Sequence, residues 1–175
     1  MVEKKALLII DVQNGLFTIE DFPIYQDDVL IKNVQNLLKR ARKAKVPIFY
    51  IQHNDPKGKR LESCTENWKI HPEIAPRNED IIIQKYNSDS FLNTSLKEEL
   101  NKHGITHLVI TGLSTPMCID TTVRSAFSRG YGVTLIQDAH STIDSEVLQA
   151  SQIISHHNDI LQWFSDLKKA EEFEF

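Results

Sequence analysis

Short runs of apolar residues alternate along the chain with longer amphipathic segments. The runs are apolar at every position, which is typical of strands covered on both faces of a parallel sheet. The clearest run covers residues 6–10 and stops at Asp11. Further strands are predicted over residues 48–51, 81–83, 107–111 and 131–137.

Helices are predicted between these strands. The first begins near Asp28, where apolar residues recur at helical spacing and form one stripe: Leu30, Val34, Leu37, Leu38 and Ala41. A second is predicted to begin near Ser95, because residues 95–98 (SLKE) have the form of a capping box, and Gly104 gives it a C-terminal stop.

Two more helices and an ambiguous tail complete the pattern. Thr115 followed by Pro116 predicts the start of a helix that runs to about Arg129, with Thr115 as its cap. Another helix is expected over about residues 144–157. The tail after Ile160 is ambiguous and is compatible with a short sixth strand followed by a charged helical end.

Regular alternation of strands and helices predicts an α/β fold. We expect three layers, α/β/α, around a parallel sheet of five to six strands with right-handed crossovers. A length of 175 residues suits one domain, residues 1–175. Residues 53–78 are polar and contain three prolines, so they predict a long loop of the kind that often serves as a functional lid.

Composition and charge exclude several classes of protein. With 41% hydrophobic residues, 25% charged residues and a net charge of -4, the chain is typical of globular proteins and unsuited to nucleic acid. Neither a membrane-spanning apolar run nor a secretory signal is recognised. Two cysteines, Cys64 and Cys118, form no disulfide framework, so we expect a cytoplasmic protein.

Three reactive side chains follow predicted strands: Asp11, Lys85 and Cys118. The carboxyl ends of parallel strands meet at one edge of the sheet, so these residues are predicted to converge there as base, cation and nucleophile. In the first turn of its helix, Cys118 would have a lowered pKa. The alternatives are a buried structural thiol, a turn-capping Asp11 and a surface Lys85. Cys64 lies in a polar stretch and is not favoured.

Three segments resemble those of isochorismatase-like cysteine hydrolases. Residues 7–17 (LLIIDVQNGLF) resemble the opening motif of that family, residues 83–91 (IQKYNSDSF) its lysine segment, and residues 110–126 (ITGLSTPMCIDTTVRSA) its nucleophile segment. The three occur in the order of the family and cover most of the chain from residue 6 to about residue 140.

The resemblance implies a six-stranded parallel sheet and a catalytic triad of Asp11, Lys85 and Cys118. It also implies a cis peptide bond between Leu113 and Ser114, with the backbone amides of Ser114 and Cys118 forming an oxyanion hole. The implied reaction cleaves a C–N bond of a small amide, ureide or carbamoyl compound through a thioester on Cys118. A homodimer or higher homo-oligomer is expected by the same analogy.

Departures from the family pattern restrict the substrate and the cofactor. Nicotinamidases of this family bind a metal through an Asp-x-His and a later His, whereas residues 52–56 here read QHNDP. We therefore predict no metal and no cofactor, and we disfavour nicotinamide. His53 and His71 are interpreted as solvated or structural, with pocket-lining as the alternative. Apolar walls for a small substrate are predicted at Leu16, Phe17 and Trp68.

Other functions stay open at this point. A Ser or Cys–His–Asp hydrolase would pair Ser114 or Cys118 with His140 and Asp138, but residues 112–116 (GLSTP) lack the second glycine of a nucleophile elbow. No Gly-rich phosphate loop follows a strand, which disfavours a nucleotide-binding module. An isochorismatase-type vinyl ether hydrolase needs no thioester, and a non-catalytic binding or scaffold protein would retain the same fold.

Overall fold

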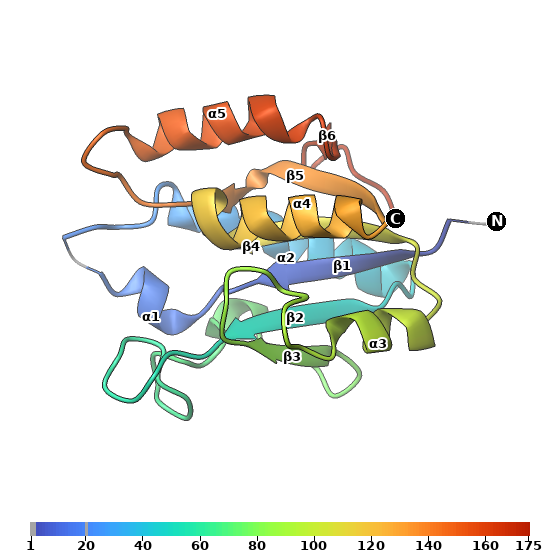
Figure 1. Cartoon of the computed structure of the whole chain (residues 1–175), viewed down its shortest axis with the longest axis horizontal. Helices are drawn as coiled ribbons and strands as arrows, with labels where there is room; N and C mark the ends of the chain where they lie inside the picture. Colours follow the sequence, from blue (N-terminus) through green and yellow to red (C-terminus); the bar gives the residue numbers. More distant parts are fainter. Residues whose placement is uncertain (1–2, 20) are drawn as a thin grey trace.

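Six parallel strands form one continuous sheet at the centre of the fold (Figure 1). The computed structural model describes residues 3–19 and 21–175. The sheet order is β3-β2-β1-β4-β5-β6. The strands are β1 (Lys5–Ile10), β2 (Ile48–His53), β3 (Ile81–Lys85), β4 (His107–Leu113), β5 (Gly132–Ser141) and β6 (Asp166–Lys168). The five predicted strands are thus confirmed, and the tail contains the short sixth strand. The charged helical end expected after that strand was wrong, because residues 169–175 form turns and coil.

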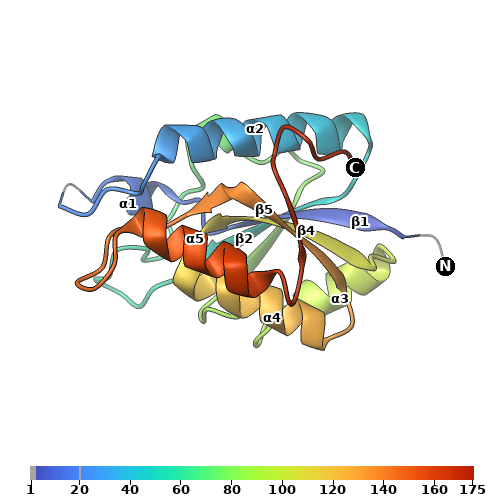
Figure 2. The same ribbon diagram turned by 90° about the horizontal axis from the view of Figure 1, so that it is seen from above.

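Helices cover both faces of this sheet and complete three layers (Figure 2). One face carries α2 (Asp27–Lys43), while α3 (Leu96–Lys102), α4 (Asp120–Ser128) and α5 (Ala150–Leu161) cover the other. A short α1 (Asn14–Phe17) follows β1, and a 3-10 turn, η1 (Pro72–Ile74), lies within the long connection from β2 to β3. The predicted α/β class is confirmed. No helix within the described residues is long and apolar enough to cross a membrane.

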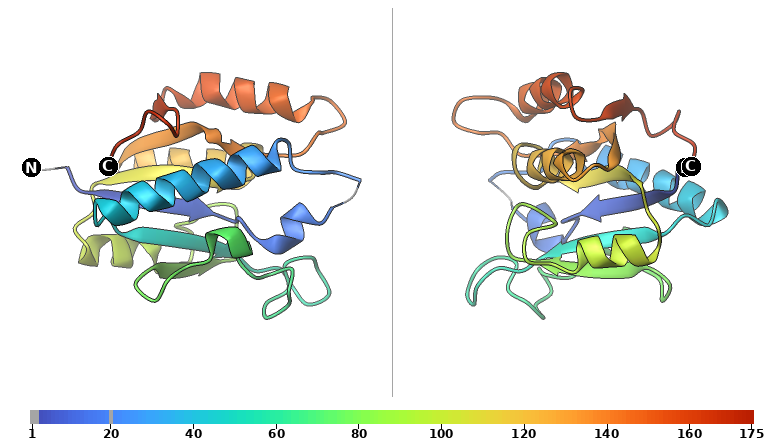
Figure 3. Two further views of the ribbon diagram at one scale, coloured as in Figure 1. Left: turned by 180° about the vertical axis from the view of Figure 1, so that it is seen from behind. Right: turned by 45° about the vertical axis from the view of Figure 1, so that its right-hand side comes forward.

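The sheet separates two hydrophobic cores. Alternate residues of β1 point to opposite sides, so Leu7 and Ile9 pack with the buried face of α2, whereas Leu8 and Ile10 pack with α3 and α4. The C-terminal residues 169–175 return across the α2 face, where Phe173 joins that core (Figure 3). All five positions of the helical stripe predicted for α2 are buried.

Three local predictions about helix ends were wrong. The α5 helix begins at Ala150 rather than near residue 144, and Gln149 and Gln152 cap it reciprocally. Ser95 precedes α3 without a capping bond; the hydroxyl of Thr94 accepts the Leu96 amide hydrogen instead. Thr115 does not cap a helix either. It opens η2 (Thr115–Ile119), a five-residue π-helix that leads into α4.

Gly112 of β4 pairs with Ile10 of β1, and the two backbones leave no room there for a Cβ atom. Its φ is +121°, and a Cβ atom there would overlap the carbonyl oxygen of Ile10. We expect Gly112→Ala to lower the free energy of unfolding by about 3 kcal/mol or more, through both strain and overlap. Gly130 also has a positive φ, but nothing lies within 4 Å of a Cβ there. In urea denaturation, Gly130→Ala should cost only about 1–2 kcal/mol; equal losses would contradict this interpretation of Gly112.

Candidate active site

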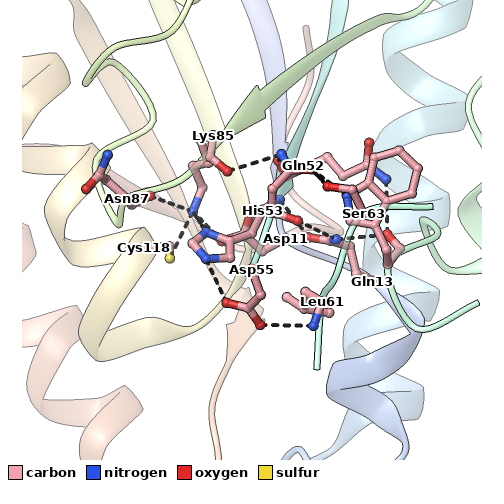
Figure 4. Close-up of polar contacts among 12 residues, drawn as sticks. Asp11, Gln13, Gln52, His53, Asp55, Leu61, Ser63, Lys85, Asn87 and Cys118 are labelled. Atoms are coloured by element: carbon pink, nitrogen blue, oxygen red, sulfur yellow. Dashed lines mark hydrogen bonds and ion pairs between the residues drawn. The ribbon is translucent and has the colours of Figure 1, made fainter. Parts of the chain in front are cut away.

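The carboxyl ends of β1, β3 and β4 bring the three predicted reactive side chains together. Asp11 directly follows β1, Lys85 is the last residue of β3, and Cys118 lies in η2 just beyond β4. The Lys85 ammonium lies 2.6 Å from Asp11 Oδ2 and 3.1 Å from Cys118 Sγ (Figure 4). The convergence expected from strand order is confirmed as geometry.

Backbone contacts hold Asp11 and Lys85 in this arrangement. Asp11 has a φ of 52°, and its amide donates to the carbonyl of Ile51 in the neighbouring strand. The Lys85 side chain is fully buried, and its ammonium also donates to the carbonyl oxygen of Asn87 at 3.1 Å. A buried ion pair of this kind is held by neighbouring hydrogen bonds rather than by solvent.

A buried glutamine joins the edge of the sheet to the long loop. The Gln13 amide donates to the carbonyl oxygens of His53 and Trp68 and accepts from the backbone amide of His53. The Trp68 indole in turn donates to the buried side chain of Asn54. These bonds fix residues of the loop 54–71 against the ends of β1 and β2.

The buried environment of Cys118 raises its pKa. Burial is the largest cause, the Asp11 carboxylate acts in the same direction, and the Lys85 ammonium opposes them, so the pKa of Cys118 rises to about 12. The predicted lowering of this pKa by a helix N-terminus was wrong. Cys118 lies in a five-residue π-helix rather than in the first turn of α4, and a buried carboxylate lies beside it.

The Asp11 carboxylate supports the charged state of the Lys85 ammonium. Burial alone would lower the pKa of Lys85, but the charge of Asp11 and the hydrogen bonds to Asp11 and Cys118 together outweigh it and raise this pKa overall. Asp11 Oδ1 is buried and has no hydrogen-bond partner among the described residues. The resting site therefore holds a protonated thiol, a carboxylate with one free oxygen, and an ammonium between them.

His53 contacts Lys85, a contact that was not predicted from the sequence. It is the last residue of β2, and its Nδ1 lies 3.3 Å from Lys85 Nζ. Its Nε2 lies 3.4 Å from Asp55 Oδ1. The rule that placed Asp11 and Lys85 at the edge of the sheet also places a residue ending β2 there, so the signal was present.

The remaining predicted residues lie around or away from this centre. The Leu113–Ser114 peptide bond is cis, as the resemblance implied. Leu16 and Phe17 pack against the core on the α2 face, and Trp68 is half-buried within the loop 54–71. Phe17 also lines a hollow of about 640 Å³ together with His71; this hollow is not lined by Asp11, Lys85 or Cys118.

The contacts of His140 and Asp138 do not form the alternative triad. His140 is buried between the Thr115 hydroxyl and the Asn158 side-chain oxygen, each at 2.9 Å. The side chain of Asn158 donates to a backbone carbonyl, so its oxygen accepts from His140 Nε2 and the Thr115 hydroxyl donates to Nδ1. Asp138 accepts from the backbone amide of Ala170. Both residues thus have structural partners.

Burial of His140 makes stability depend on pH. Burial lowers the pKa of His140 to about 4, against about 6.5 in the unfolded chain. Between pH 6.5 and 4 His140 is therefore protonated in the unfolded chain but largely neutral in the folded chain. The free energy of unfolding should fall by about 3 kcal/mol as pH drops from 6.5 to 4. His140→Gln, which cannot titrate, should lose most of this slope in urea denaturation.

A matched control isolates this effect. His156 is exposed, so His156→Gln should keep the wild-type slope. The half-buried His71 and the buried His107 also have pKa values lowered by burial and contribute with the same sign, but they are present in both variants. An unchanged slope in His140→Gln would contradict the assignment.

Comparison with known proteins identifies the family. The sequence model of the isochorismatase domain matches residues 5–155. The chain belongs to the isochorismatase family. YddQ of Bacillus subtilis, an uncharacterised isochorismatase-family protein, is 32% identical over 154 residues, 85% of this chain and 86% of YddQ. A streptothricin hydrolase of Streptomyces noursei is 31% identical over 140 residues, 80% of this chain and 55% of that protein.

Solved structures agree with this assignment. An isochorismatase from Pseudomonas putida has a TM-score of 0.90 and 27% identity, covering 97% of this chain and 89% of that one. An N-carbamoylsarcosine amidase from Thermoplasma acidophilum has a TM-score of 0.81 at 19% identity, covering 98% of this chain and 99% of that one, and it supports the fold. As an isochorismatase-family protein, the chain is a hydrolase.

Proposed function

We propose that this isochorismatase-family hydrolase cleaves a C–N bond of a small amide, ureide or carbamoyl compound through a thioester on Cys118. The observation that carries the proposal is the Lys85 ammonium, which contacts both the Asp11 carboxylate and the Cys118 sulfur. A nucleophile, a base and a cation in mutual contact are the requirements of covalent acyl transfer. The names of the streptothricin hydrolase and the amidase among the similar proteins agree with amide chemistry.

The first half of the reaction uses the free oxygen of the carboxylate. Asp11 takes the thiol proton as the Cys118 sulfur attacks the carbonyl carbon, and Lys85 stabilises the charge on both. The backbone amides of Ser114 and Cys118 are proposed to donate to the oxyanion. The C–N bond then breaks, Asp11 returns the proton to the leaving nitrogen, and the acyl group stays on sulfur.

The second half releases the acid. Asp11, again ionised, takes a proton from a water molecule, whose oxygen attacks the thioester carbon, and the proton passes to the departing sulfur. Leu16, Phe17 and Trp68 are retained as proposed apolar walls for the substrate. No step in this scheme needs a metal or an organic cofactor, and residues 52–56 lack the metal-ligand pattern of nicotinamidases.

An ammonia-release screen tests this function. Small primary amides, ureides and carbamoyl compounds are incubated with wild type, Cys118→Ala and Cys64→Ser, and isochorismate is assayed separately for vinyl ether cleavage. We expect at least one nitrogen compound to be hydrolysed by wild type and by Cys64→Ser but not by Cys118→Ala. Hydrolysis that survives in Cys118→Ala, or turnover of isochorismate alone, would overturn the thioester mechanism.

A further inference from the structure

The ammonium of Lys85 has more acceptors than hydrogens. It carries three N–H groups and cannot accept a hydrogen bond. Four acceptors lie within hydrogen-bond distance of Nζ: Asp11 Oδ2 at 2.6 Å, Asn87 O at 3.1 Å, Cys118 Sγ at 3.1 Å and His53 Nδ1 at 3.3 Å. The two oxygens are the stronger acceptors and take two hydrogens. Sulfur and imidazole nitrogen therefore compete for the third.

The contacts of His53 fix which of its nitrogens carries hydrogen. Because Lys85 only donates, a hydrogen bond between these two atoms requires an unprotonated Nδ1, which leaves the ring hydrogen on Nε2. Nε2 faces Asp55 Oδ1 at 3.4 Å, while the other oxygen of Asp55 accepts from the Leu61 amide at 2.9 Å. The backbone of His53 is itself held by Gln13. These contacts hold the ring against Lys85 in one orientation (Figure 4).

We propose that His53 is a positioning residue that shares the third Lys85 hydrogen with the Cys118 sulfur. In the thiol and thioester states sulfur is a weak acceptor, and the hydrogen bonds to His53 Nδ1. When the thiol proton passes to Asp11, the sulfur becomes an anion and the same hydrogen turns to it. No proton leaves Lys85; one hydrogen bond changes its acceptor. This inference rests on the proposed function for its catalytic meaning, but the hydrogen bond exists without it.

Few charged groups act on Cys118 or contact the His53 ring. The charges that act on Cys118 are those of Asp11, at the end of β1, and Lys85, at the end of β3. The charged groups in contact with the His53 ring are Lys85 and Asp55. Asp55 is not among the charges that act on Cys118, so removing the acceptor at position 53 is expected to reach the sulfur through Lys85. The thiolate should become easier to form.

A pair of similar-sized substitutions tests the acceptor. Asn and Leu have nearly the same shape, and Asn places its side-chain oxygen where His has Nδ1. In a Cys64→Ser background, so that Cys118 is the one thiol, iodoacetamide labelling at about pH 8 is followed by intact mass. We expect His53→Leu to label about three- to tenfold faster than wild type, because the whole third hydrogen bond goes to sulfur. His53→Asn should label within about twofold of wild type.

The outcomes separate this inference from the proposed function. Faster labelling in His53→Leu, with recovery in His53→Asn, supports the shared hydrogen bond even if the substrate screen finds nothing, because labelling needs no substrate. Equal labelling rates in all three proteins would overturn it. Equal changes in both variants would also overturn it, since packing or the lost contact with Asp55 would then explain the data.

Discussion

Asp11→Asn is expected to reduce hydrolysis about a thousandfold or more while making Cys118 more reactive toward iodoacetamide at neutral pH. The carboxylate is the proposed proton acceptor, so its removal stops catalysis. Its charge also helps to raise the pKa of Cys118, and without it the Lys85 ammonium acts on the sulfur unopposed. The two effects have opposite signs, which mere disruption of the site would not produce.

Asp138→Asn is the matched control for this prediction. Asp138 lies in β5 and accepts from the Ala170 amide, which an asparagine oxygen also does. It was the carboxylate of the alternative triad, so its variant should keep near-wild-type hydrolysis and labelling. If hydrolysis falls with Asp138→Asn and persists with Asp11→Asn, the assignment of the base is wrong. If Asp11→Asn slows alkylation, the electrostatic account of the thiol is wrong.

Lys85→Met is expected to abolish hydrolysis and to lower the free energy of unfolding by about 3–5 kcal/mol. The side chain is fully buried and Asp11 is almost so, and removal of the cation leaves a buried carboxylate without its partner. The double variant Asp11→Asn/Lys85→Met removes both charges. It should recover most of the lost stability in urea denaturation but none of the activity.

An exposed ion pair gives the comparison for this cycle. Lys69 pairs with Glu66 in the loop between β2 and β3, with 56% of the lysine and 81% of the glutamate side chain exposed. Lys69→Met should cost less than about 1 kcal/mol, as solvent-exposed pairs do. If the double variant is no more stable than Lys85→Met alone, burial of an unpaired charge is not the cause of the loss.

The sheet and the meeting of the three reactive residues follow from simple regularities in the sequence. Continuous apolar runs such as residues 6–10 predict buried parallel strands, and parallel strands place Asp11 and Lys85 at one edge whatever the loops do. The helical stripe of α2 was equally direct. These features depend on local pattern and on topology, and both can be read from the order of the residues.

The details that the sequence did not disclose depend on contacts between distant residues. Thr115 was expected to cap a helix, but its hydroxyl bonds to His140, 25 positions away, and the chain forms a π-helix instead. The pKa of Cys118 depends on how deeply the thiol is buried and on the distance to a carboxylate. Neither quantity can be read from the order of residues around position 118.

His53 shows a different kind of omission. Its place at the end of β2 was predictable, and it was interpreted as solvated or structural because the metal-ligand pattern of nicotinamidases is absent. The structure instead places its ring against Lys85, with Asp55 behind it. A histidine can act on a site through hydrogen bonding alone, so the absence of a metal pattern was not evidence against a role.

The most direct test of the thioester mechanism is the mass of the enzyme during turnover. Wild type and Cys118→Ala are each mixed with a compound that the ammonia-release screen has shown to be a substrate. The reaction is quenched in acid within the first turnovers, and the mass of the protein is measured intact and after digestion. We predict a mass gain equal to the acyl group, located on Cys118 and missing from Cys118→Ala. Steady hydrolysis by both proteins with no adduct on either would contradict the account.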